Sequence, residues 1–224
     1  MQNPEKYGAI QKAVREILAQ LPPDATLVAA AKTRTPEEAL AAFEAGVQII
    51  GHNYIQEAEA MKAVLGDRVR WHFIGHLQKN KANKAALLFD MVETLDSLEI
   101  AERLDAACGK IGKTMAVLVE INSGREEAKS GVFPEEAEKV CHGIAGLKNL
   151  RLEGLMTMGP FTGNPEDSRP YFRVTRELRD MIARAGIEGI SMKKLSMGMS
   201  DSWRVALEEG ATMVRIGTLL FGSR

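Results

Sequence analysis

Eight short apolar segments recur along this chain, and longer amphipathic segments separate them. We predict each of the eight to be a β-strand: residues 26–31, 47–50, 69–74, 90–94, 115–121, 150–156, 194–197 and 212–216. Strands that are apolar along their whole length are typical of parallel sheets, because helices then cover both faces. The alternation therefore predicts an α/β fold built on parallel strands.

The number of strands favours a single (β/α)8 barrel of the TIM type, with residues 1–224 forming one domain. An open, doubly wound sheet is the alternative that this pattern leaves open. The first segment has apolar residues at helical spacing and no strand before it, while only eight residues follow the last predicted strand. We therefore expect an extra N-terminal helix, no helix after the last strand, and the first helix in the place of the missing one.

Charge and cysteine content restrict the class of protein. Lys and Arg total 29 and Asp and Glu total 30, so the balanced charge gives no reason to expect a nucleic-acid partner. The two cysteines, Cys108 and Cys141, are far apart and match neither a disulfide framework nor a zinc motif. No apolar run approaches the length of a membrane span, and the N-terminus lacks the features of a signal peptide. We expect a cytoplasmic protein that holds no metal and contacts no membrane.

Polar residues stand where several of the predicted strands end. Lys32 ends the first strand, Asn53 and His76 follow the second and third, and Arg215 lies in the eighth. In a barrel of this kind, functional residues lie at the carboxyl ends of the strands and in the loops that follow them. We therefore expect these side chains to converge on one mouth of the barrel.

Two loops near the end of the chain predict an anion site. In LSMGMSDSW, residues 195–203, Ser200 would be a good N-cap for the helix that follows. Exposed N–H groups at a helix start bind anions, and Gly217 and Thr218 of RIGT would add further donors. The loops after strands seven and eight commonly hold phosphate in such barrels. The alternative is that Ser200 only caps its helix and Gly217 only turns the chain.

Arg215 lies in an otherwise apolar strand, and a buried guanidinium needs an acceptor because it does not lose its proton. Either a barrel carboxylate such as Glu120 or a ligand would supply that acceptor. Near this cation and away from water, Lys32 would favour the neutral amine that condenses with a carbonyl group. The alternative is that Lys32 reaches the mouth and forms a salt bridge there. A phosphate site, a buried arginine and a strand-end lysine together fit pyridoxal 5′-phosphate (PLP).

Seven motifs carry a family resemblance: VAAAKTRT, GHNYIQEA, WHFIGHLQKNK, INSGREEAKSG, GLMTM, LSMGMSDSW and VRIGTLLFGSR. In this order, over nearly the whole chain, they closely resemble the pyridoxal phosphate homeostasis proteins of the YggS and PROSC type, which are relatives of the alanine racemase barrel. The resemblance implies a (β/α)8 barrel in which Lys32 forms the Schiff base and Arg215 faces the pyridine nitrogen.

The same resemblance implies the remaining PLP contacts. The phosphate would be held by Ser200, Gly217 and Thr218, with Met199 shaping that loop, and Asn53 and His76 would line the cofactor face. Two residues depart from the family pattern: His52 stands where a glutamate is usual, and Ala31 stands where a serine is frequent.

The expected function is that of a carrier, with no catalytic residues. Arg215 would keep the pyridine nitrogen unprotonated, which weakens PLP as an electron sink. Alanine racemases that this chain resembles take a second base, a tyrosine, from a further domain of a partner chain, and here only Tyr54 is a plausible substitute. We therefore expect a monomer that holds PLP and supplies it to other enzymes through transient contacts. The alternatives are a PLP-dependent enzyme with weak racemase activity and a non-covalent binder of phosphate ligands.

Overall fold

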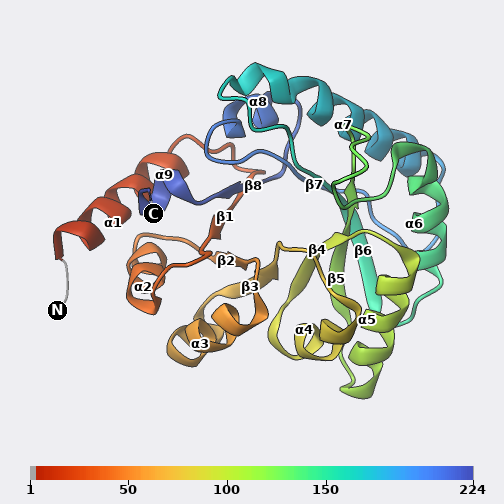
Figure 1. The fold of residues 1–224 in the computed structure, drawn as a ribbon, viewed down its shortest axis with the longest axis horizontal. Coiled ribbons are helices and arrows are strands. Elements are labelled where there is room, and N and C mark those ends of the chain that lie inside the picture. The colour runs from red at the N-terminus through yellow and green to blue at the C-terminus, as the bar shows by residue number, and fades with distance from the viewer. Residues whose placement is uncertain (1–3, 224) are drawn as a thin grey trace.

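Eight parallel strands pair in sequence order and close into a barrel, with β8 hydrogen-bonded to β1, in the computed structural model, which describes residues 4–223 (Figure 1). The strands are β1 (Thr26–Ala30), β2 (Ile49–His52), β3 (Arg70–Phe73), β4 (Met91–Leu95), β5 (Met115–Ile121), β6 (Leu150–Thr157), β7 (Lys194–Ser196) and β8 (Met213–Ile216). All eight predicted strands are present, and closure of the sheet rules out the doubly wound alternative.

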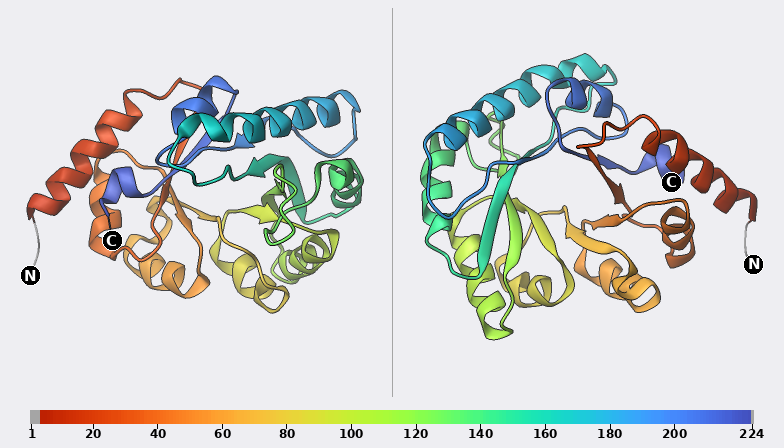
Figure 2. Two further views of the ribbon diagram at one scale, coloured as in Figure 1. Left: turned by 45° about the horizontal axis from the view of Figure 1, so that its top comes forward. Right: turned by 180° about the vertical axis from the view of Figure 1, so that it is seen from behind.

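Helices surround the barrel, as Figures 1 and 2 show from three directions. The α-helices are α1 (Pro4–Leu18), α2 (Pro36–Glu44), α3 (Ile55–Leu65), α4 (Ala82–Leu88), α5 (Leu98–Lys110), α6 (Ala137–Ala145), α7 (Arg169–Arg184), α8 (Trp203–Glu208) and α9 (Thr218–Phe221). The 3-10 helices are η1 (Gly66–Arg68), η2 (Lys79–Lys81), η3 (Pro134–Glu136) and η4 (Pro165–Ser168). Within residues 4–223, no helix combines the length and the apolar character that crossing a membrane requires.

The N-terminal helix closes the outer ring as predicted. Its apolar face buries Ile10, Val14 and Ile17, and α1 packs against α2 and α9. The expectation of no helix after the last strand needs a correction, because β8 is followed by the four-residue α9. One helical turn is too short to cover a strand. Helix α1 lies beside α9, and the two together cover the outer side of the barrel at β8 and β1 (Figure 1).

The strands alternate between two buried surfaces, as the two-residue period of a strand requires. Their outward side chains join the helices in one large core, and the inward ones form a smaller apolar cluster inside the barrel. Polar side chains share that inward set near the carboxyl ends of the strands. Glu93, Glu120, Ser196 and Arg215 are at most 4% exposed. The barrel therefore carries a buried polar layer directly beneath its mouth.

Candidate functional site

A cavity of about 610 Å³ opens at the carboxyl ends of β1, β2, β6, β7 and β8. It is lined by seven of the eight residues predicted to contact PLP: Lys32, Asn53, Met199, Ser200, Arg215, Gly217 and Thr218. Ala30, Ile74, Met158 and Phe161 add apolar surface to the same cavity. The structure thus brings together a lysine, a buried arginine and two loops that lie far apart in the sequence.

Lys32 is two positions beyond Ala30, the last residue of β1, and lies in the wall of this cavity. Its Nζ lies 5.0 Å from the centre of the Tyr54 ring, a cation–π contact. The alternative that Lys32 forms a salt bridge at the mouth is not what the structure has, since Lys32 makes no ion pair with the residues at positions 4–223. The Lys32 amine therefore contacts the face of the Tyr54 ring. If the amine moved away from that ring, no carboxylate would lose an ion-pair partner.

Arg215 is fixed inside the barrel by two hydrogen bonds. Its Nη1 donates to Ser196 Oγ at 2.6 Å, and its Nη2 donates to the carbonyl oxygen of Thr157 at 2.9 Å. Ser196 in turn donates to Glu93 Oε2 at 2.6 Å. Of the two acceptors that the sequence left open, a barrel carboxylate balances Arg215: Glu93 does so through the Ser196 hydroxyl group, and the charge of Glu120 lies nearby.

Glu93 lies at the centre of this buried chain. Its Oε1 lies 2.6 Å from His72 Nδ1, so that His72, Glu93, Ser196 and Arg215 form one connected chain across the barrel interior. Burial favours the neutral acid, but the hydrogen bonds from His72 and Ser196 and the charge of Arg215 hold the pKa of Glu93 below its ordinary value. Sequence reasoning missed Glu93, although an acid within the apolar run MVETL is the same signal that drew attention to Arg215.

Ser200 does not cap the helix that follows it, contrary to one alternative from the sequence. Helix α8 begins at Trp203 with Ser202 at its N-cap position. The hydroxyl of Ser200 instead accepts hydrogen bonds from the backbone N–H groups of Gly217 and Leu219, each at 3.3 Å. The loops after β7 and β8 therefore meet at Ser200, where backbone donors converge on an oxygen atom as they would on an oxygen of an anion.

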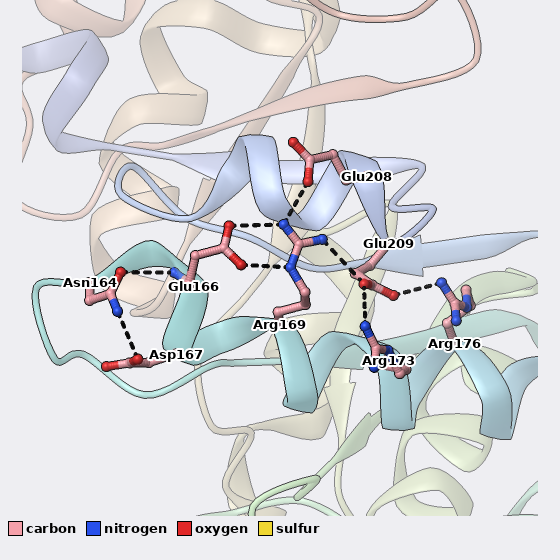
Figure 3. A network of polar contacts seen from close by, with 8 residues as sticks. All are labelled: Asn164, Glu166, Asp167, Arg169, Arg173, Arg176, Glu208 and Glu209. Carbon is pink, nitrogen blue, oxygen red and sulfur yellow. Dashed lines mark hydrogen bonds and ion pairs between the residues drawn. The ribbon is translucent and has the colours of Figure 1, made fainter.

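The loop that carries Ser200 is held firmly by the helix that follows it. Gly198 has a φ of +87°, and a Cβ atom there would lie 2.6 Å from that of Ala206 in α8, so only glycine fits. The buried Glu209 at the end of α8 accepts hydrogen bonds from Arg169, Arg173 and Arg176 of α7 at 3.3, 3.4 and 2.6 Å (Figure 3). Helix α8 is thus tied to α7, which limits the movement of the loop that carries Ser200.

His76 lies in an adjoining cavity of about 520 Å³ and not among the residues that line the first one. Asn53 lines both cavities, so it forms part of the wall between them. The Nδ1 atom of His76 lies 3.0 Å from Asp96 Oδ2 and 3.2 Å from Ser130 Oγ. The predicted contact between His76 and the cofactor face therefore stays a prediction, and the geometry associates His76 with Asp96 and Ser130.

Glu120 points into the barrel at the end of β5 and is 4% exposed. Burial raises the pKa of its carboxyl group from 4.5 to about 7, and the nearby charge of Arg215 offsets this only in part. Because the folded state then binds this proton more tightly than the unfolded chain, the stabilisation is complete below pH 4.5 and is lost as the pH rises through about 7.

Glu120→Gln removes this titration. We expect the free energy of unfolding of the unsubstituted protein, relative to that of the variant, to fall by about 3 kcal/mol as the pH rises across this range. Urea denaturation of both proteins at a series of pH values measures the difference. The shifted pKa of His52 is common to both proteins and cancels. A constant difference across the range would show that Glu120 does not titrate in this way.

Among residues 4–223, no three or more His, Cys, Asp or Glu side chains are grouped so that they could hold a metal ion. Cys108 and Cys141 are both buried and unpaired. The chemically notable groups that remain are the lysine amine, the buried guanidinium and the convergent backbone donors.

Known proteins share both the fold and the sequence. The family described as alanine racemase, N-terminal domain, matches residues 6–224. An alanine racemase of Clostridium difficile 630 superposes with a TM-score of 0.84 at 18% identity, covering 97% of this chain and 57% of that one, which shows a shared fold. Fold and site together define an α/β-barrel protein of the alanine racemase N-terminal class.

Closer relatives identify the family within that class. The pyridoxal phosphate homeostasis protein of Aquifex aeolicus is 42% identical over 201 residues, which is 89% of this chain and 87% of the relative. The Synechocystis protein of the same name is 38% identical, covering 93% and 96%. A solved structure of PipY from Synechococcus elongatus with PLP bound has a TM-score of 0.87 at 32% identity, covering 95% and 100%. This chain belongs to the family of pyridoxal phosphate homeostasis proteins.

Proposed function

We propose that this protein binds PLP in the cavity at the barrel mouth, holds it through a Schiff base to Lys32 and supplies it to other enzymes. The observation that carries the proposal is the convergence of an amine, a cation and anion-binding loops on one cavity of about 610 Å³. Membership of the homeostasis family and the PLP-bound PipY structure support the same ligand.

The residues present fit the chemical groups of PLP. The backbone donors of Gly217 and Leu219, now shared by the Ser200 hydroxyl, would bind the phosphate. Arg215 would donate to the pyridine nitrogen, and Asn53 with the apolar residues of the wall would contact the ring. PLP supplies an aldehyde, and the amine of Lys32 would condense with it to form a C=N bond and release one water molecule.

The same residues argue for a carrier in preference to an enzyme. Arg215 is held in place by Ser196 and Thr157 and remains a donor, so it would leave the pyridine nitrogen unprotonated. Racemisation also needs a proton donor on the face opposite Lys32. Tyr54 packs against Lys32 itself, which favours a role in holding the free amine.

The experiment that tests the proposal is a titration of the purified protein with PLP, followed by its visible absorbance spectrum. A yellow band that saturates at one equivalent is expected, followed by no turnover when amino acids are added. Racemisation or decarboxylation at about 1 s⁻¹ or faster would place the protein among ordinary enzymes and overturn the carrier function.

Removal of one phosphate contact should separate phosphate recognition from the rest of the site. We expect Ser200→Ala to weaken PLP binding about tenfold, since a charge-assisted hydrogen bond and the order of two loops are lost. Binding of pyridoxal, which has no phosphate, serves as the matched control and should change less than about twofold. Equal losses for the two ligands would mean that Ser200 does not contact the phosphate.

A further inference from the structure

The turn that carries Lys32 has a costly backbone conformation. Arg34 N–H donates to the Ala31 carbonyl oxygen at 3.0 Å, which closes a four-residue turn with Lys32 and Thr33 at its centre. Thr33 has a φ of +63°, in the left-handed region. Glycine or asparagine usually occupies such a position, and a β-branched residue is disfavoured there. Something in the surrounding structure must therefore hold Thr33 in place.

Glu57 provides that restraint from another element. It lies in the first turn of α3, and its Oε2 accepts the backbone N–H of Thr33 at 3.0 Å. This hydrogen bond joins the loop after β1 to the helix after β2, directly beside Lys32. A backbone N–H paired with a carboxylate is a strong, charge-assisted contact.

The far side of the turn is fixed as well. The guanidinium of Arg34 donates to the carbonyl oxygens of Phe221 and Gly222 at 3.3 and 2.6 Å. Thr35 then caps the N-terminus of α2 through a capping box that it forms with Glu38. The chain is therefore anchored on the C-terminal side of Thr33, and the hydrogen bond to Glu57 restrains the backbone of Thr33 itself.

His52 lies beneath Glu57 and leaves its carboxylate available. The imidazole is completely buried, and its Nδ1 has no hydrogen-bond partner but lies 3.9 Å from Glu57 Oε2. Burial lowers the pKa of His52 to about 4, so the ring is neutral at neutral pH. Glu57 Oε2 therefore lies near a neutral ring, and it accepts its hydrogen bond from the backbone N–H of Thr33.

We propose that Glu57 is a positioning residue for Lys32: it holds Thr33 in the left-handed conformation and so orients the Lys32 amine toward the cavity. This inference rests on the proposed function, in which Lys32 forms the Schiff base. Loss of Glu57 would let Thr33 relax into an ordinary conformation, and the amine at the preceding residue would turn away from its bonding position.

The first measurement compares Glu57→Ala with a matched control, Glu59→Ala. Glu59 lies on the same helix and pairs with Lys84, away from the Lys32 turn. Glu57→Ala is expected to lower the equilibrium constant for Schiff-base formation with PLP about tenfold, and Glu59→Ala to leave it unchanged. Affinity for inorganic phosphate, which needs only the loops after β7 and β8, should stay the same in both variants.

Two further readouts separate positioning from a general structural role. In the ligand-free protein, hydrogen exchange at the Thr33 amide should become faster in Glu57→Ala, while amides in β1 remain protected. In a Thr33→Gly background, the left-handed conformation carries no strain. There, Glu57→Ala should lower the equilibrium constant for Schiff-base formation less than about threefold. In Glu57→Gln, the amide oxygen can still accept the Thr33 N–H. This variant should therefore lower the equilibrium constant for Schiff-base formation less than Glu57→Ala does.

The outcomes distinguish this inference from the function on which it rests. If the unsubstituted protein forms no yellow adduct with PLP, the proposed function fails. If it does, but Glu57→Ala forms the adduct equally well, only the role of Glu57 is wrong. A parallel loss of phosphate affinity, or an equal loss in the Thr33→Gly background, would also refute that role.

Discussion

Lys32→Ala is expected to abolish the covalent yellow adduct with PLP. The residue lines the cavity of about 610 Å³ and is the lysine that lies there with the buried Arg215. An amine held in place reacts far more readily than free lysines on the surface, so labelling at saturating PLP should fall at least about a hundredfold. The apparent affinity for inorganic phosphate should persist, because the loops around Ser200 are untouched.

Borohydride reduction followed by peptide mapping measures this effect directly. In the unsubstituted protein, the reduced label should be found on the peptide that contains Lys32. Lys81→Ala provides the matched control, because Lys81 lines the adjoining cavity and its substitution removes the same charge as Lys32→Ala. A label that maps to another lysine in the unsubstituted protein would move the site and refute the assignment.

Arg215→Met is expected to destabilise the fold by about 3–5 kcal/mol, because it leaves a buried carboxylate without its cation. Glu93 is fully buried, and its link to Arg215 through Ser196 is part of what keeps its pKa below the ordinary value. Methionine has a similar length and no charge, so the loss reports mainly on the uncompensated Glu93. Chemical denaturation measures the difference in free energy of unfolding.

Arg215→Met combined with Glu93→Gln tests the cause of that loss. Because the double variant buries no unpaired charge, it should recover at least about 2 kcal/mol relative to Arg215→Met alone. Additive losses from the two substitutions would show that Arg215 and Glu93 are not coupled. The double variant should also bind PLP with an altered absorbance maximum, since it lacks Arg215, the proposed partner of the pyridine nitrogen.

The positions of the strands and of the two key charges could be predicted from the sequence. Each of the eight predicted strands overlaps an observed one, because strands buried on both faces need an unbroken apolar run. Lys32 and Arg215 drew attention because charged residues are rare within such runs. An apolar run and a charged residue within it can both be recognised from a few neighbouring residues, so a single sequence is enough to identify them.

Other parts of the site could not be predicted in this way. Ser200 looked like the cap of the helix that follows it, yet its hydroxyl accepts the N–H groups of Gly217 and Leu219 at the start of α9. Lys32 was considered for a salt bridge, and it lies over the ring of Tyr54 instead. Both contacts depend on how neighbouring loops meet above the barrel. The spacing of apolar residues in the sequence does not predict how those loops meet.

The sequence by itself therefore determined the class of fold and the places where polar groups interrupt apolar strands, because burial and side-chain period act over a few residues. Only the tertiary structure decided which group pairs with which. Pairing of β7 with β8 brings Arg215 to Ser196, 19 positions away, and closure of the barrel brings Ser196 to Glu93 of β4, 103 positions away. Such pairs form because inward-facing side chains of different strands share one narrow interior, which exists only after the ring of strands has closed.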